Sequence, residues 1–296
     1  MYKAYLYLTI ATMCWGANAV FSRAAVGEVP PLMLVTIRWT GAVIIILLFS
    51  FKTVRQDWVI MKPRWGYLFL MGGMGFAIFN ALMYVAAHTT TAVNIGIIQG
   101  GIPIFVLVWM FLIFSQRISL LQFLGVCLTL FGVTWVAAAG NLANLLSLAV
   151  VQGDLYMIIA CMLYAGYAVG LKNKPDVSFI SVFVAMAASA MIISLPMMAY
   201  EIVNGDSFWP TAKGWKIAFA ITIFPSVIAQ LCFILGVAQL GATRAGVFVN
   251  LVPIFASLFA VLFLSEQFHL YHGIALVLVL GGIWISERFN KSQQAT

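Results

Sequence analysis

The chain has 296 residues, of which 64% are hydrophobic and only 8% are charged. An ordinary soluble domain has about a quarter charged residues, and a soluble fold of this size could not keep so much apolar surface out of water. The composition therefore predicts an integral membrane protein with the lipid bilayer as a partner. The net charge of +7 does not indicate a nucleic-acid partner, because the Lys and Arg residues lie between apolar runs and form no basic stripe with interleaved aromatics.

Breaks at Pro, Gly and charge clusters divide the chain into ten apolar stretches. Each is close to the roughly 20 residues that a helix needs to cross the hydrocarbon core. We expect spans at 4–24, 32–51, 66–86, 92–114, 121–138, 153–171, 179–200, 214–237, 244–264 and 272–288. The apolar run after Lys3 is too long for a signal peptide and has no convincing cleavage site, so it is interpreted as the first span. The expected fold class is an all-α integral membrane protein with ten transmembrane helices.

The Lys and Arg residues predict the orientation of these spans, because positive charge is retained on the cytoplasmic side. With a cytoplasmic N-terminus, eleven of the 15 basic residues fall in inside segments, three fall outside, and Arg38 lies within the second span. An even number of spans then places the C-terminus inside as well. We expect a multi-pass protein of the plasma (inner) membrane with both termini in the cytoplasm.

The two halves of the chain resemble each other. A shift of 150 residues aligns 92–138 with 242–288 without a gap. The aligned identities include Gly96 with Gly246, Pro103-Ile104-Phe105 with Pro253-Ile254-Phe255, Ser115 with Ser265 and Gly132 with Gly282. Each copy holds five spans, and because five is odd the second copy must be inverted, an architecture typical of transporters with a midplane substrate site. The expected domains are a first five-helix repeat at 1–140, a connecting segment at 141–152, a second repeat at 153–288 and a tail at 289–296.

Short motifs along the whole chain resemble the EamA-type transporters of the drug/metabolite transporter superfamily. These motifs are Trp15-Gly16, Arg38, the Gly96–Pro103 stretch, Pro253, Leu264-Ser265-Glu266 and Gly281-Gly282. The resemblance implies ten helices packed around a central cavity and the movement of amino acids, metabolites or xenobiotics, often outward. The first copy departs from the second at one point, where Ser115-Gln116 stands opposite Ser265-Glu266.

Polar and aromatic residues near the middle of the spans predict the walls of that cavity. The shift of 150 pairs Asn80 with Gln230 and Gly100 with Asn250, and a shift of 149 pairs Trp15 with Tyr164 and Asn18 with Tyr167. We expect substrate contacts from Trp15, Asn18, Asn80, Tyr84, Gln99, Tyr164, Tyr167, Gln230 and Asn250. For each amide the alternative is helix–helix packing, and for each aromatic it is a core or lipid-facing position.

Four further residues are candidates for helix breaks or gates. Pro103 and Pro253 can interrupt a helix and free backbone carbonyls toward a cavity. Glu266, at the outer end of the ninth span, is interpreted as a gate or helix-end residue. Arg38 could face a carboxylate substrate, or it could pair with a carbonyl or with an acid near the outer surface.

Neither a metal nor a cofactor is expected. Cys14, Cys127, Cys161 and Cys232 all lie in apolar runs without CxxC spacing, which favours small buried side chains over a disulfide or a zinc site. An intramembrane enzyme is disfavoured, since the sequence has no HExxH, no GxSxG and no acidic pair.

We expect an alternating-access exporter or facilitator for a small-molecule substrate. An amide and aromatic cavity without fixed charge suits neutral or zwitterionic solutes such as amino acids and related metabolites. Drug-like or quaternary amine compounds are the alternative, because aromatic rings attract cations. No acid lies securely at the centre of a span, which disfavours proton exchange through an embedded Glu and leaves coupling to protons or to a counter-solute open.

Overall fold

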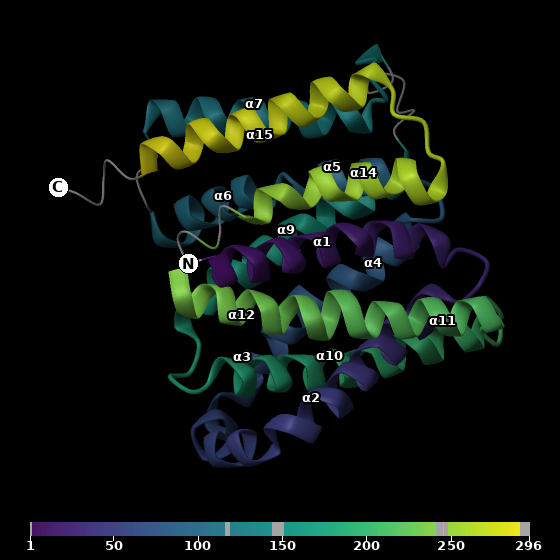
Figure 1. The fold of residues 1–296 in the computed structure, drawn as a ribbon, viewed down its shortest axis with the longest axis vertical. Helices are drawn as coiled ribbons and strands as arrows, with labels where there is room; N and C mark the ends of the chain where they lie inside the picture. The colour runs from purple at the N-terminus through teal and green to yellow at the C-terminus, as the bar shows by residue number, and fades with distance from the viewer. Residues whose placement is uncertain (1, 116–118, 144–150, 241–244, 246–247, 291–296) are drawn as a thin grey trace.

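The computed structural model describes residues 2–115, 119–143, 151–240, 245 and 248–290 (Figure 1). Gln116, residues 144–150 of the expected connecting segment and residues 291–296 of the expected tail lie outside these ranges. The α-helices are α1 (Tyr2–Ala24), α2 (Pro31–Met61), α3 (Trp65–Gly72), α4 (Phe79–Ala86), α5 (Ala92–Gln99), α6 (Ile102–Phe114), α7 (Leu120–Ala137), α9 (Gln152–Gly170), α10 (Phe179–Val203), α11 (Ala212–Ile221), α12 (Ala229–Leu240), α14 (Val252–Leu264) and α15 (Leu270–Asn290). Short π-helices, η2 (Gly73–Ile78) and η4 (Thr222–Ile228), and the 3-10 turns η1 (Lys62–Arg64), η3 (Leu171–Asn173) and η5 (Val249–Leu251) complete the described elements.

Within the described residues, seven helical stretches are long and apolar enough to cross a membrane. One of them, Pro31–Ala86, is 56 residues long and covers the second and third expected spans, and two shorter apolar helices occupy Val249–Leu264 and Leu270–Ile285. This confirms the all-helical membrane class, and the count of ten stays a prediction. The second span is longer than expected, because α2 continues from the apolar run through Lys52 and Arg55 to Met61.

The helices lie roughly parallel and antiparallel to one another in a single bundle (Figure 1). α1 begins and α15 ends at the same end of this bundle. α5 packs against α14, α9 and α1, and its residues Ala92 to Ile98 are all buried. Large apolar side chains at the periphery are exposed, among them Leu48 and Phe49 of α2 at 75% and 86%, as expected for a surface that faces lipid rather than water.

Corresponding helices of the two halves pack against each other in opposite directions. Thr129 of α7 donates from Oγ1 to the carbonyl of Val279 in α15 at 3.3 Å, and these two residues are 150 positions apart. A Cβ on Gly132 would meet Leu278 at 2.9 Å, whereas a Cβ on Gly282 would meet the carbonyl of Gly125 at 2.6 Å. As the residue numbers increase along α7, those of the residues that they contact in α15 decrease, so the two helices are antiparallel.

α2 and α10 form a second pair of this kind. The amide of Leu32 donates to the Glu201 carboxylate at 2.9 Å, and Thr36 Oγ1, one turn further along α2, donates to the carbonyl of Ser194 at 3.2 Å. The sequence numbers again increase in one helix and decrease in the other. Antiparallel packing of equivalent helices is the geometry that an inverted repeat requires.

Backbone irregularities recur at equivalent places in the two halves. The π-helices η2 and η4 lie about 150 residues apart, each inside a longer helix. Pro103 and Pro253 both lie in the first turn of their helices, α6 and α14. Both helices end on a serine in the left-handed region, Ser115 with φ 52° and Ser265 with φ 55°. The repeat is therefore present in the backbone as well as in the sequence.

Candidate functional site

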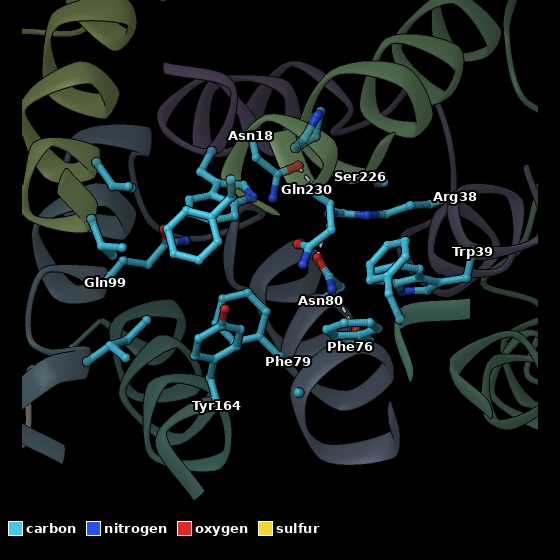
Figure 2. Close-up of a pocket in the computed structure, with 18 residues that line it drawn as sticks. Asn18, Arg38, Trp39, Phe76, Phe79, Asn80, Gln99, Tyr164, Ser226 and Gln230 are labelled. Atoms are coloured by element: carbon cyan, nitrogen blue, oxygen red, sulfur yellow. Dashed lines mark hydrogen bonds between the residues drawn. The ribbon is translucent and has the colours of Figure 1, made fainter. Parts of the chain in front are cut away.

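A cavity of about 190 Å³ lies between the two halves of the chain. It is lined from the first half by Trp15, Asn18, Arg38, Trp39, Gly75, Phe76, Phe79, Asn80, Gln99 and Ile102, and from the second by Tyr164, Phe183, Pro225, Ser226, Gln230, Phe233, Val249 and Val252. Figure 2 shows amide, aromatic and guanidinium groups converging on this space from several helices. Both π-helices contribute to the lining, which fits the frequent occurrence of π-bulges at functional sites.

The lining residues of the two halves correspond to each other. The shift of 150 residues relates five pairs: Gly75 with Pro225, Phe76 with Ser226, Asn80 with Gln230, Gln99 with Val249, and Ile102 with Val252. The shift of 149 adds Trp15 with Tyr164. Equivalent positions of the two copies therefore both line one cavity, with different side chains in the two halves.

Six of the nine expected contact residues line the cavity, namely Trp15, Asn18, Asn80, Gln99, Tyr164 and Gln230. Tyr84 lies behind the wall, where it is 2% exposed and its hydroxyl accepts a hydrogen bond from Arg38. Tyr167, 4% exposed, packs its ring 5.4 Å from Phe76 and 5.2 Å from Tyr164. Asn250 is outside the lining, between the lining residues Val249 and Val252, and its Oδ1 is buried without a partner.

Arg38 is the one charged side chain among the lining residues that the structure describes. It is 5% exposed, and Nη1 lies 3.1 Å from Asn18 Oδ1, 2.7 Å from Asn80 Oδ1 and 2.6 Å from the Tyr84 hydroxyl. The expectation of a cavity without fixed charge is therefore wrong. The sequence placed Arg38 inside the second span, but it could not show which face of that helix turns toward the first and third spans.

The other expected gate residues, Pro103, Pro253 and Glu266, are not among the lining residues, although the two prolines directly follow the lining residues Ile102 and Val252. The Glu266 carboxylate accepts the backbone N–H groups of Ala92 at 2.9 Å and Val93 at 3.0 Å, at the start of α5. It therefore ties the end of α14 in the second half to a helix of the first half. The α5 helix ends at Gln99 and α6 begins at Ile102, next to Pro103, so the helix is interrupted between two lining residues.

Several aromatic side chains that line the cavity were not predicted from the sequence. Trp39 and Phe76 stack with centroids 4.6 Å apart and planes 4° from parallel, and the Arg38 guanidinium carbon lies 5.0 Å from the Trp39 ring centroid. Phe79, Phe183 and Phe233 complete this set. The signal that could have found part of it is the repeat itself, since Phe76 lies one turn before Asn80 on the same helix face and its repeat mate is Ser226.

A second buried polar cluster lies outside the cavity lining. Asp154, in the first turn of α9, is fully buried. Its carboxylate accepts hydrogen bonds from the Thr90 hydroxyl and from Asn94 Nδ2, the latter at 3.3 and 3.1 Å. His272 Nε2 lies 3.2 Å from Asn94 Oδ1. This cluster joins the first turns of α5, α9 and α15.

The fold and the cavity together define a multi-span membrane protein of the transporter class. The chain belongs to the EamA-like transporter family, whose sequence model matches residues 2–138 and 151–287. This confirms the resemblance drawn from the motifs, and it points to a transporter rather than an enzyme.

Similar proteins share this class without a defined substrate. Uncharacterised transporter YetK of Bacillus subtilis (strain 168) is 22% identical over 99% of this chain and 89% of its own. An uncharacterised transporter of Archaeoglobus fulgidus is 24% identical over 96% and 97% of the two chains, and YyaM of Bacillus subtilis is 26% identical over 94% and 92%. A crystal structure of a protein with 17% sequence identity matches 98% of both chains with a TM-score of 0.66, which is a likeness of fold alone.

Proposed function

We propose that this protein is an alternating-access transporter that exports or facilitates the movement of small neutral or zwitterionic solutes, such as amino acids and related metabolites. The observation that carries the proposal is the cavity lined by equivalent positions of the two repeats. Two inverted copies can exchange conformations by rocking, which exposes a site between them alternately to each side of the membrane. The aromatic and amide lining suits solutes with both apolar bulk and hydrogen-bonding groups.

The proposed topology has ten transmembrane helices in two inverted sets of five, at 1–140 and 153–288, joined by 141–152 and followed by the tail 289–296. Antiparallel packing of α7 with α15 and of α2 with α10 supports the inversion. The excess of Lys and Arg in the inside segments supports placing both termini in the cytoplasm and the protein in the plasma membrane. In this topology Glu266 acts as a gate at the outer face. Pro103 and Pro253, in the first turns of α6 and α14, act as helix breaks, one in each half.

Proteoliposome uptake of a labelled amino-acid panel, with and without a pH gradient, tests this proposal. Among variants, Gln230→Ala is the sharpest, since Gln230 lines the cavity and none of the described residues forms a hydrogen bond with it. We expect uptake to fall about tenfold with an unchanged yield of folded protein. Gln239→Ala is the matched control, because Gln239 lies on the same helix with an exposed side chain.

Asn80→Ala should also impair uptake, but it is a less direct probe. Asn80 accepts from Arg38 and donates to the carbonyl of Phe76 at 2.6 Å, so its loss disturbs packing as well as the cavity. Equal losses of folded protein and of uptake in Gln230→Ala would favour a packing role for this amide. Absence of uptake for every solute in the panel would count against the transporter proposal itself.

Drug-like or quaternary amine compounds form a second candidate class, favoured by the number of aromatic rings around the cavity. Such rings attract cations through their faces. Uptake of labelled tetraethylammonium in the same vesicles separates the two classes, because this permanent cation is neither neutral nor zwitterionic and the first candidate predicts no uptake of it.

A further inference from the structure

The Arg38 guanidinium is a buried cation without a counter-ion. Its side chain is 5% exposed, and it forms no ion pair with any acid in the described ranges of the chain. Its described hydrogen-bond acceptors are two amide oxygens and a phenol hydroxyl, all uncharged. Removing a charged side chain from water without an opposite charge costs several kcal/mol, so such a group is retained in a membrane span when it serves a site.

The guanidinium also has unused hydrogen-bonding capacity on one edge. It has five N–H groups, and the two on Nη1 point to the oxygens of Asn18, Asn80 and Tyr84. Nε is buried without a partner, and Nη2 has no acceptor among the described residues. The edge formed by Nε and Nη2 offers two parallel N–H groups, which is the fork that binds a carboxylate in a bidentate manner.

The surroundings of Arg38 hold the guanidinium in place at the cavity. Asn18 comes from α1, Asn80 and Tyr84 come from α4, and the Trp39 ring lies beside the guanidinium carbon. Figure 2 shows the Arg38 side chain extending toward Asn18 and Asn80 at the cavity wall. No described lining residue is an acid, a lysine or a histidine, so the cavity carries a single positive charge and nothing to neutralise it.

We propose that Arg38 is the docking group for the carboxylate of the transported solute, so that the cavity selects solutes with one carboxylate on an apolar body. This inference rests on the proposed transport function, narrows its zwitterionic solutes to those with an apolar body, and extends the substrate class to simple monocarboxylates. The aromatic rings opposite Arg38 take the apolar part, and the amides of Gln99 and Gln230 provide acceptors for an ammonium group where the solute has one. The same positive charge excludes solutes that carry only a cation.

Three probes with one carbon skeleton separate these features: L-leucine, 4-methylpentanoate, which lacks the ammonium group, and 3-methylbutylamine, which lacks the carboxylate. Binding to the purified full-length protein is measured by calorimetry and by thermal stabilisation. L-phenylalanine, 3-phenylpropanoate and phenethylamine repeat the comparison with greater bulk. We expect the carboxylate probes to bind and the amines to bind at least tenfold more weakly. Inorganic phosphate is added to test whether any oxyanion suffices, and we expect it not to displace leucine.

Arg38→Gln should reduce the affinity for the carboxylate probes at least tenfold, and Arg38→Lys should give an intermediate loss, because Lys keeps the charge without the fork. Arg23→Gln is the matched control, since the Arg23 guanidinium donates to the carbonyl of Ala87 away from the cavity. We expect this control to bind like the wild-type protein. The comparison of probes on wild-type protein needs no variant, so poor folding of Arg38→Gln does not prevent the test.

The inference is overturned if the amines bind as tightly as the carboxylates, if phosphate displaces leucine, if no carboxylate probe binds, or if Arg38→Gln binds them unchanged. Proteoliposomes separate this result from the transport proposal. Binding of carboxylates with no uptake would refute transport and leave the Arg38 site standing, whereas equal uptake of acid and amine probes would refute the Arg38 role and leave transport standing.

Discussion

Two buried charged side chains in this protein, Asp154 and Arg38, differ in how fully they are hydrogen-bonded. Asp154 is fully buried and Arg38 is 5% exposed. The Asp154 carboxylate accepts from Thr90 and Asn94 through both oxygens, whereas Arg38 leaves Nε unpaired and lines the cavity. Both carry the same desolvation cost in principle. The difference is that both carboxylate oxygens of Asp154 accept hydrogen bonds within the protein, whereas Arg38 keeps an N–H group without an acceptor.

This contrast indicates two roles. A charge whose hydrogen bonds are all internal can stabilise the contact between elements, and Asp154 joins the first half, through Thr90 and Asn94, to α9 of the second. A charge that lines a cavity and keeps unpaired N–H groups can bind a ligand that enters the cavity. We therefore expect changes at Asp154 to act on folding and changes at Arg38 to act on binding.

The largest expected effect is that of Asp154→Ala on stability. The substitution leaves the Thr90 hydroxyl and Asn94 Nδ2 without their acceptor in a buried site, which costs about 1–3 kcal/mol for each group. Fluorescence-detected size-exclusion chromatography and thermal unfolding should show a large loss of folded protein. Asp206→Ala, at an exposed acid, should behave like the wild type. Equal melting temperatures for Asp154→Ala and the control would contradict a stabilising role.

A smaller effect on stability is expected for Arg38→Met. The amides that lose the guanidinium line the cavity, so water in the cavity can replace one of their hydrogen bonds. The Tyr84 hydroxyl, behind the wall, loses the Arg38 donor without such a replacement, and the removal of an uncompensated buried charge offsets this loss. We expect a change of about 1 kcal/mol or less in the free energy of unfolding. A loss of folded protein as large as that of Asp154→Ala would show that the two charges do not differ in role.

Glu266 and Glu201 extend the comparison to the helix ends. Glu266 accepts the N–H groups of Ala92 and Val93 at the start of α5, and Glu201 accepts those of Leu32 and Met33 at the start of α2. An anion at a helix N-terminus contributes about 0.3–1 kcal/mol, and more when it is partly buried. Both contacts join the second half to the first.

Glu266→Gln and Glu201→Gln should each cost about 1 kcal/mol of stability, because a neutral amide interacts less strongly with two N–H groups. If Glu266 is the outer gate, its variant alone should also change the uptake rate in proteoliposomes, by a factor of a few. The melting temperatures of the two variants provide the baseline. Equal changes in uptake for both would indicate that Glu266 is a helix cap and not a gate.

Periodicity and composition were sufficient to predict the class of fold. They could not show which side chains of a helix face the cavity and which face the lipid. Trp15, Asn18, Asn80 and Gln230 were predicted because polar groups near mid-span at repeat-related positions are unusual. Trp39 was missed because an aromatic residue in an apolar run gives no signal of whether it faces lipid or a cavity.

Contacts between elements that are distant in the chain also could not be predicted from the sequence. Nothing in the sequence around Asp154 indicates burial, and its burial results from the meeting of the first turns of α5, α9 and α15. The length of α2 was underestimated for a different reason, since the helix continues beyond the apolar run to Met61. Hydropathy indicates only the part of a helix that lies in the lipid, whereas the helix itself continues as far as its backbone hydrogen bonds do.

The smallest expected effect belongs to a charge that water already solvates. Glu28, in the loop between α1 and α2, accepts from the Thr211 hydroxyl and from Lys213 Nζ at 3.0 Å. The Thr211 hydrogen bond, and then Lys213, hold the pKa of Glu28 below its ordinary value of 4.5. Since a lowered pKa favours the ionised form in the folded state, this contribution is present above pH 4.5 and is lost as the pH falls through the lowered value.

Glu28→Gln should therefore melt slightly below the wild type at pH 7, and the difference should shrink as the pH falls below 4.5. Paired melting curves at pH 7, 5 and 3.5 measure the difference directly, because acid effects common to both proteins cancel. Added salt should reduce the difference at pH 7, since exposed ion pairs are screened. A difference that widens as the pH falls would contradict the assignment, because only a group with a raised pKa contributes more in its protonated form.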